Sequence, residues 1–431
     1  MKKESYYSLA EEVLTSFLAA SSPLDSFLAH FFRKHRFLGA TDRRSLAEFL
    51  YFVIRQQGAL EALCQQTQAP PAPLARLLIV SAVGVREATL ENLTPTPEEQ
   101  RWLTERLLPG SSRLDALQQE NCPAWCRTLF EETFGTRWPE EVAALQNPAP
   151  VDLRVHPGKI TRQEVLRMLS EEGISATLTP YSPWGVRLAP GVRLSAGHLL
   201  LRSGQMEIQE EGAQLVSLLL PVSPGATVVD YCAGAGGKTL VLAHRLQNRG
   251  VLYAVDVSSQ RLERARLRLR RAGASKVRMV DLSQSPQWVE QHQKQGDLVV
   301  VDVPCSGTGT WRRNPDAKRR LTPAGLQETC QKQQEILHSA STLVRPGGLL
   351  AYITCSLWKT ENENQVEHFL RTHSDFVLQE VAPFWQQAFS SPCIAPGPFL
   401  FLTPAQHSTN GFFLALFERK VVRSEGFEPT T

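Results

Sequence analysis

The sequence of 431 residues lacks several features that mark whole classes of proteins. It has no apolar run of about 18 residues or more, so no membrane-spanning helix is expected. Its first residues, MKKESYYSLAEEVLTSF, follow a basic pair with acidic residues rather than an apolar run, so no secretory signal is expected. No internal repeat or low-complexity tract is present. With 42% hydrophobic and 21% charged residues, the chain can bury a core.

Cysteine is also scarce, with 8 residues in the whole chain. That number is too small for a disulfide scaffold, and no C-x-x-C spacing indicates a zinc cluster. Cys122 and Cys126 lie one helical turn apart, with no second pair nearby. We therefore expect no metal site, and a reducing cytoplasmic compartment in which free thiols can do chemistry.

Charge of either sign is nearly balanced, at a net +3, but it is unevenly distributed. Residues 1–150 carry 15 basic and 18 acidic side chains, a net charge of −3. Residues 226–431 carry 24 basic and 18 acidic side chains, a net charge of +6. A weakly basic C-terminal half permits a polyanionic partner without requiring one.

Hydrophobic periodicity divides the chain into four parts. Residues 1–145 have apolar residues at three- and four-residue steps and no strand-like alternation, which predicts an all-helical bundle. Residues 146–222 contain short strand-like runs and one helix, which predicts a small α+β module. In residues 223–420, short apolar runs alternate with helices, which is typical of a doubly wound parallel sheet. The polar residues 421–431 are expected to form a flexible tail.

A glycine-rich turn follows the first apolar run of the third part. Glycines between a strand and a helix let the backbone approach a ligand, and the helix start offers free amides. A phosphate-binding P-loop needs glycine where Cys232 stands, and a dinucleotide-binding loop needs glycine where Thr239 stands. The turn is therefore predicted to bind another adenosine-type ligand, with Lys238 as either a loop stabiliser or a helix-start residue. Its residues are Cys232, Ala233, Gly234, Ala235, Gly236, Gly237 and Lys238.

Three aspartates end three consecutive predicted strands. Asp256 is placed to accept ribose hydroxyls, Asp281 to flank an adenine, and Asp302 to lie at the same rim of the sheet. Strand-end aspartates are also common helix caps. Three of them in series after a glycine-rich turn favour a ligand site.

Two cysteines follow buried strands at this rim. Cys305 lies in DVPCSGTG and Cys355 lies in YITCS. A single cysteine at such a place is ordinarily a packing residue, but two on neighbouring strands in polar turns indicate reactive thiols. The basic run after Cys305 is predicted to contact an RNA backbone, whereas the arginine-rich stretch 258–273 is either a solvated helix face or a phosphate contact. The predicted RNA-binding residues are Arg312, Arg313, Lys318, Arg319 and Arg320.

Together these motifs resemble the Nop/Sun family of S-adenosylmethionine-dependent RNA cytosine-5 methyltransferases. The resemblance rests on CAGAGGKT, DVPCSGTG and YITCS followed by Glu361-Asn362-Glu363, and it covers about residues 150–420. One departure is Gly234-Ala235, where the family commonly has Ala-Pro. Residues 1–145 are similar to the N-terminal module of the bacterial Sun/RsmB type, which acts on small-subunit ribosomal RNA.

The resemblance implies a NusB-like helical bundle that binds RNA or a partner, an RRM-like α+β module, and a Rossmann-like methyltransferase domain. It implies S-adenosyl-L-methionine as the cofactor and RNA, above all 16S ribosomal RNA, as the partner. We expect a cytoplasmic monomer without a membrane or DNA partner. Transfer RNA as the substrate, and a non-catalytic RNA-binding assembly factor that retains the fold, are the alternatives.

The resemblance also assigns catalytic roles. Cys355 would attack carbon 6 of cytosine, Cys305 would assist the later proton loss from carbon 5, and Asp302 would hold N3 or the exocyclic amine. Spacing alone does not decide which cysteine attacks.

Overall fold

The computed structural model describes residues 3–86, 93–107, 111–395 and 397–421. The chain folds into two compact units, which are Met1–Pro148 with Thr310–Pro323 and Ala149–Gly309 with Ala324–Thr431. The expected division into four domains stays a prediction, and of the expected tail only Val421 lies within the described residues. No helix in the described ranges is both long and apolar enough to cross a bilayer.

Unit 1 is helical, as its periodicity predicts. In α3, Leu46, Phe49, Leu50 and Val53 follow three- and four-residue steps and are all buried in the core of this unit. Its elements are α1 (Lys3–Leu18), α2 (Leu24–Lys34), α3 (Ala40–Arg55), α4 (Gln57–Gln66), α5 (Leu74–Arg86), α6 (Pro97–Trp102), η1 (Leu103–Leu107), α7 (Ser111–Ala116), η2 (Gln118–Asn121), α8 (Ala124–Phe134), η3 (Gly135–Arg137), α9 (Trp138–Leu145) and α16 (Ala317–Arg320).

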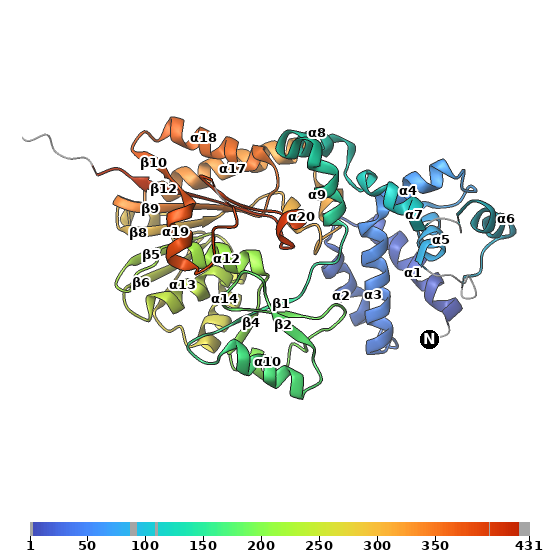
Figure 1. The fold of residues 1–431 in the computed structure, drawn as a ribbon, viewed down its shortest axis with the longest axis horizontal. Coiled ribbons are helices and arrows are strands. Elements are labelled where there is room, and N and C mark those ends of the chain that lie inside the picture. Colours follow the sequence, from blue (N-terminus) through green and yellow to red (C-terminus); the bar gives the residue numbers. More distant parts are fainter. Residues whose placement is uncertain (1–2, 87–92, 108–110, 396, 422–431) are drawn as a thin grey trace, which may run out of the picture. The chain divides into compact units, whose positions relative to one another are not determined.

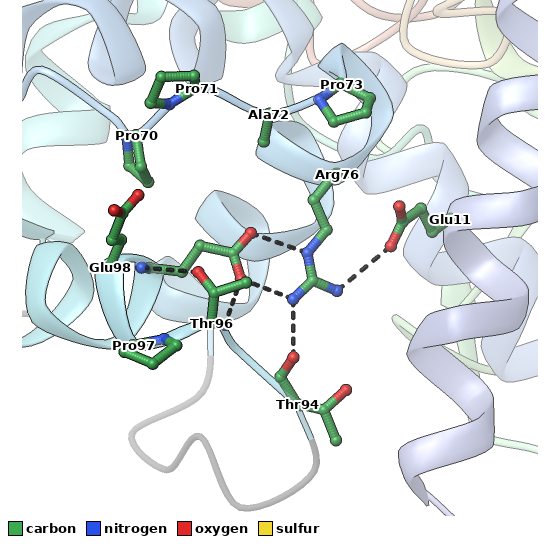
Figure 2. Close-up of a pocket in the computed structure, with 11 residues that line it drawn as sticks. Glu11, Pro70, Pro71, Ala72, Pro73, Arg76, Thr94, Thr96, Pro97 and Glu98 are labelled. Carbon is green, nitrogen blue, oxygen red and sulfur yellow. Dashed lines mark hydrogen bonds and ion pairs between the residues drawn. The ribbon is translucent and has the colours of Figure 1, made fainter.

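A polar network links three helices of unit 1 around Arg76 on α5 (Figure 2). Arg76 donates to both carboxylate oxygens of Glu99 on α6, at 2.9 and 2.7 Å, and to Glu11 on α1 at 3.3 Å. It also donates to the carbonyl of Thr94 at 2.9 Å. Glu99 in turn caps α6 through a reciprocal pair of hydrogen bonds with Thr96. The network satisfies a nearly buried carboxylate and fixes α1, α5 and α6 to one another.

The segment 310–323 packs within unit 1, although the sequence suggested that it belongs to the methyltransferase part. Trp311 is buried beside Phe130 of α8, with ring centroids 5.8 Å apart. Asp316 accepts a hydrogen bond from the Leu24 amide at the start of α2, at 3.2 Å. Lys318 on α16 is buried and donates to the carbonyl of the last α3 residue at 2.9 Å.

Unit 2 begins with a four-stranded antiparallel sheet in the order β2-β3-β1-β4. Helix α10 starts at a capping box of Thr161 and Glu164 and buries Val165 and Leu169 against this sheet. The result is the expected small α+β module. Its elements are β1 (Asp152–Val155), α10 (Arg162–Glu171), β2 (Ala176–Leu178), β3 (Gly185–Leu188), α11 (Leu199–Arg202) and β4 (Met206–Ile208).

The rest of unit 2 is built on an eight-stranded sheet in the order β10-β12-β9-β8-β5-β6-β7, with β11 paired to β12 (Figure 1). The pairs from β9 through β7 are parallel, and β12 is antiparallel to each of its partners. These strands are β5 (Thr227–Tyr231), β6 (Val251–Asp256), β7 (Val277–Asp281), β8 (Gly296–Asp302), β9 (Val344–Thr354), β10 (Phe376–Gln379), β11 (Leu400–Leu402) and β12 (Phe412–Arg419).

Helices cover both faces of this sheet (Figure 1). Successive β5 residues show the alternation: Val228 packs in a core with α12, α13 and α19, and Val229 packs in the opposite core with α17 and α18. The doubly wound architecture predicted from the apolar runs is confirmed. The helices are α12 (Glu211–Leu219), α13 (Gly237–Leu246), α14 (Ser259–Ala272), α15 (Trp288–Gln291), η4 (Thr308–Thr310), α17 (Pro323–Ser341), η5 (Lys359–Glu361), α18 (Glu363–Thr372), α19 (Val381–Ala388) and α20 (Pro404–His407).

Candidate active site

Strand order places a ligand site between β5 and β8. From β5 the chain adds β6 and then β7 on one side, and it later returns to add β8 and β9 on the other. At such a switch point the loops beyond the carboxyl ends of neighbouring strands diverge and leave a crevice for a ligand. The glycine-rich turn follows β5, and Asp302 ends β8, so the predicted site residues begin at this point.

The turn after β5 has an unusual backbone conformation. Cys232 has φ of 91°, which is rare for a residue with a side chain, and the amides of Cys232 and Ala233 both donate to Val255 of β6, at 2.9 Å each. Burial raises the pKa of the Cys232 thiol, so this cysteine stays protonated. Gly236, at φ of 79°, is the cap residue directly before α13, and a Cβ there would meet the Cβ of Ala265 on α14 at 2.9 Å. Here glycine is required for close packing.

Gly234 faces open space instead. It has φ of 55°, and the nearest atom to a Cβ at this position would be the Cys232 carbonyl oxygen at 4.0 Å. The amide of Gly234 donates to Asp256 at 2.9 Å, and the other carboxylate oxygen of Asp256 accepts the Ser258 amide at 2.9 Å. Asp256 therefore shapes the turn, and its oxygens keep further lone pairs for a ligand hydroxyl.

Asp281 ends β7 and is half-buried. It accepts hydrogen bonds from the hydroxyl of Ser259 and from the amide and hydroxyl of Ser283. These bonds, led by the one from Ser259, lower the pKa of the Asp281 carboxyl. In this structure Asp281 acts as a local cap, and its contact with an adenine stays a prediction.

Lys238 joins the glycine-rich turn to β8 through an ion pair. Its Nζ lies 2.5 Å from a carboxylate oxygen of Asp302, and the Lys238 side chain is only 11% exposed. Burial opposes the charge on Lys238, but the Asp302 carboxylate outweighs that effect and raises the lysine pKa. Lys238 is therefore a charged partner of Asp302, and not simply a helix-start residue.

Asp230 is an ionisable residue of this site that sequence reasoning missed. It lies within β5, is fully buried, and accepts a hydrogen bond from the hydroxyl of Thr239 on α13 at 2.6 Å. Burial raises its pKa to about 6. Its place inside an apolar run, ATVVDY, gave no sign that it would approach the pair Lys238–Asp302.

The two candidate cysteines lie together. The sulfurs of Cys305 and Cys355 are 3.3 Å apart, which is far longer than a disulfide bond of about 2.05 Å, so both are free thiols in contact. The amide of Cys355 also approaches the Cys305 sulfur at 3.4 Å. The hydrogen bond with Cys355 and then burial raise the pKa of Cys305 well above its ordinary value.

The predicted RNA-binding residues belong to unit 1. Arg312 and Lys318 are buried, with Arg312 directed at the carbonyls of Asn147 and Pro148. Arg319 donates to the Leu18 carbonyl at 3.1 Å, and Arg320 pairs with Asp316. Much of this positive charge is thus engaged within the helical unit. RNA contact by the set Arg312, Arg313, Lys318, Arg319 and Arg320 stays a prediction.

The arginine-rich helix α14 has internal partners as well. Glu207 on β4 pairs with Arg268 at 3.2 Å and with Arg271 at 2.5 Å. Arg268 also donates to the carbonyl of Ala235 in the glycine-rich turn, at 2.7 Å. These two arginines support the turn and the small sheet.

Comparison with known proteins identifies the family. Residues 217–418 match the model of the 16S rRNA methyltransferases RsmB/F, and residues 122–195 match the ferredoxin-like domain of RsmF/B-like methyltransferases. The chain is 31% identical to the ribosomal RNA small subunit methyltransferase B of Salmonella newport over 318 residues, which cover 73% of this chain and 72% of that protein. The chain belongs to the RsmB/F family of 16S rRNA methyltransferases. The resemblance seen in the sequence motifs is therefore confirmed.

Two further relatives of this RsmB/F family member extend over most of the chain. The probable ribosomal RNA small subunit methyltransferase B of Synechocystis is 29% identical over 410 residues, 88% of this chain and 91% of that one. The crystal structure of PH0851 has a TM-score of 0.74 and 26% identity, covering 97% of this chain and 99% of that chain. This match therefore extends over residues of both units.

Proposed function

We propose that this chain transfers a methyl group to carbon 5 of a cytosine in small-subunit ribosomal RNA, through a covalent bond between a cysteine and the base. Two free thiols in contact, 3.3 Å apart beyond the carboxyl ends of β8 and β9 in a methyltransferase fold, are the observation that carries the proposal. One thiol alone would suffice for nucleophilic attack. A second thiol at contact distance fits a reaction in which a separate group must help to remove the proton from carbon 5.

The residues around the turn fit S-adenosyl-L-methionine. When bound, this cofactor supplies an electrophilic methyl group. The open face of Gly234 lets the backbone of the turn approach it, and Asp256 would accept hydrogen bonds from its ribose hydroxyls. The predicted contacts of Cys232, Ala233, Ala235, Gly236, Gly237, Lys238, Asp281 and Asp302 with the cofactor belong to the same proposal.

Cys355 is the proposed nucleophile. Carbon 5 of cytosine is too weakly nucleophilic to accept a methyl group unaided, but addition of the Cys355 thiolate to carbon 6 turns the ring into an enamine. The electron pair of the former double bond would then form the new bond from carbon 5 to the methyl carbon, whose bond to the sulfonium sulfur would break and leave its electron pair on that sulfur. This assignment follows the family resemblance, in which the cysteine of YITCS is the attacking one.

Cys305 is the proposed partner in the second half of the reaction. Its pKa is raised first by its hydrogen bond with Cys355. Once the Cys355 sulfur is bonded to carbon 6, this contribution disappears and the pKa of Cys305 falls. The Cys305 thiol can then release its proton to solvent, and the resulting thiolate accepts the proton on carbon 5. The electrons of that C–H bond restore the double bond, and Cys355 departs as a thiolate.

Asp302 is the proposed contact for the pyrimidine edge. One of its oxygens pairs with Lys238, and its side chain is 35% exposed, so it can accept a hydrogen bond from the exocyclic amine of cytosine. Uracil has a carbonyl oxygen at that position, which a carboxylate repels. Asp302 would thereby select cytosine, while the ion pair with Lys238 holds the Asp302 carboxylate in place.

Methylation of defined RNAs tests this function. The full chain would be incubated with labelled S-adenosyl-L-methionine and unmodified 16S ribosomal RNA, 23S ribosomal RNA or transfer RNA, and the nucleosides analysed by mass spectrometry. We expect 5-methylcytidine in 16S ribosomal RNA alone, made by a monomer. Tight RNA binding without methyl transfer would instead identify a non-catalytic assembly factor, and 5-methylcytidine in transfer RNA would reassign the substrate.

A further inference from the structure

A buried glutamate lies behind the two thiols. Glu361 ends the short helix η5 that follows β9, and its side chain is fully buried. A buried carboxylate is costly unless hydrogen bonds satisfy it. No lysine or arginine forms an ion pair with Glu361 anywhere in the part of the chain that the structure describes. Its stabilisation therefore comes from neutral donors, and their identity shows what it does.

Those donors come from both cysteine loops. One carboxylate oxygen of Glu361 accepts the Ser306 amide at 2.8 Å, and the other accepts the Ser306 hydroxyl. This second oxygen also accepts the hydroxyl of Ser356 at 2.5 Å. Ser306 directly follows Cys305, and Ser356 directly follows Cys355. A single carboxylate thus connects the residues that follow the two thiols.

Two neighbouring amides hold the residues that precede the thiols. Gln333 on α17 donates to the carbonyl of Pro304, just before Cys305, and to Glu361, at 3.0 Å each. Asn362 accepts the hydroxyl of Thr354, just before Cys355, at 2.6 Å. Asn362 also donates to the Ser356 carbonyl at 3.0 Å. Both cysteine loops are therefore fixed on each side by one connected set of buried polar groups.

We infer that Glu361 is a positioning residue that holds Cys305 and Cys355 at the separation the methyl transfer requires. The inference rests on the function proposed above. Glu361 bonds neither sulfur, so it acts through Ser306 and Ser356. A displacement of about 1 Å in a reacting group can cost roughly 10²-fold in rate, so losing the connection slows the chemical step more than it weakens substrate binding.

Two substitutions of Glu361 separate its shape from its charge. Glu361→Ala removes every bond to the cysteine loops. In Glu361→Gln, the amide oxygen can still accept from the Ser306 amide and Gln333, and the amide nitrogen can donate to the two serine hydroxyls. Geometry is kept and only the charge is lost. Glu367→Ala, an exposed glutamate on α18, is the matched control for loss of a carboxylate.

The test measures kcat and KM for 16S ribosomal RNA methylation by the full chain. We expect Glu361→Ala to lower kcat by about 10²-fold with KM changed less than about threefold, and Glu361→Gln to recover kcat to within about tenfold of the parent. Glu367→Ala should match the parent. A folded Glu361→Ala with kcat within about threefold of the parent would overturn the inference, as would a folded Glu361→Gln that is no more active than Glu361→Ala.

Folding is checked by the affinity for S-adenosylhomocysteine, measured by calorimetry. Should Glu361→Ala fail to bind it, Ser356→Ala replaces that variant, because it cuts the bond from Glu361 to the Cys355 loop and leaves the bonds of Glu361 to Ser306 in place. We expect about tenfold lower kcat, and an unchanged kcat would count against the inference. A parent protein that makes no 5-methylcytidine in any RNA contradicts the proposed function instead, whatever the Glu361 variants do.

Discussion

The ion pair of Lys238 and Asp302 is predicted to stabilise the fold around the site, and a double-mutant cycle measures the coupling free energy between the two side chains. Unit charges at about 4 Å attract by about 4 kcal/mol at an effective dielectric constant near 20. Because the Asp302 side chain is 35% exposed, solvent screens part of this attraction, and we expect a coupling free energy of about 1–3 kcal/mol. The variants are Asp302→Asn, Lys238→Met and the double substitution, all of nearly native shape.

Hydrogen exchange of amides in β5 and β8 gives the free energy of opening near the pair in each variant. Each single substitution should lower that free energy, and the double variant should be less destabilised than the sum of the two. Methyl transfer should fall by about 10²-fold or more in Asp302→Asn and should not recover in the double variant, because the pyrimidine contact is still missing. A coupling below about 0.3 kcal/mol would refute the reasoning, since distant independent sites behave that way.

Three further predictions concern the two units. Burial lowers the pKa of Lys318 to about 7, so above pH 7 the unfolded chain binds more protons than the folded chain. From pH 7 towards pH 10 the free energy of unfolding of unit 1 should therefore rise by up to about 1.4 kcal/mol per pH unit, and Lys318→Met should flatten this rise. Urea denaturation at pH 7 and pH 9 measures it, and an equal rise in both proteins would contradict the prediction. Arg76→Ala removes the cation that pairs with the nearly buried Glu99, and it should lower the free energy of unfolding by about 3 kcal/mol in the same assay. A decrease under about 0.5 kcal/mol would show that the network does not stabilise unit 1. Gly236→Ala forces a Cβ against α14 and should weaken S-adenosylhomocysteine binding at least about tenfold. The control Gly273→Ala, at φ of 81° with open space around it, should leave the affinity unchanged. Equal affinities for the two variants would speak against the packing role of Gly236.

The strands of the methyltransferase sheet could be predicted because they are buried on both faces. Runs such as ATVVDY and DLVVVDV became β5 (Thr227–Tyr231) and β8 (Gly296–Asp302) with little change at their ends. Strands β4, β10 and β11 were not expected. Each has three or four residues and lies at or beside a sheet edge. Because such a strand has only one apolar face, its alternation of apolar and polar residues is too short to recognise in the sequence.

The site was predictable where chemistry restricts the residue type, and not where folding alone decides the partner. Paired strand ends explain why Asp302 and the two cysteine loops lie at the same edge of the sheet. By contrast, Glu361 bonds Ser306 across 55 positions of sequence, and no spacing rule connects them. The run RRNPDAKRR was predicted to contact an RNA backbone, yet Lys318 is buried and donates to a backbone carbonyl of unit 1. A lysine gives no sign in the sequence that it will be buried.

The division of labour between the two thiols is tested most directly by trapping the covalent intermediate. Parent, Cys305→Ala and Cys355→Ala proteins would be incubated with unmodified 16S ribosomal RNA and S-adenosyl-L-methionine, then separated on denaturing gels. We predict that Cys305→Ala accumulates a protein–RNA adduct bearing the transferred methyl group, because the adduct cannot be resolved, and that Cys355→Ala forms none. An adduct in Cys355→Ala but not in Cys305→Ala would reverse the two roles, and full activity in either variant would contradict the two-thiol mechanism.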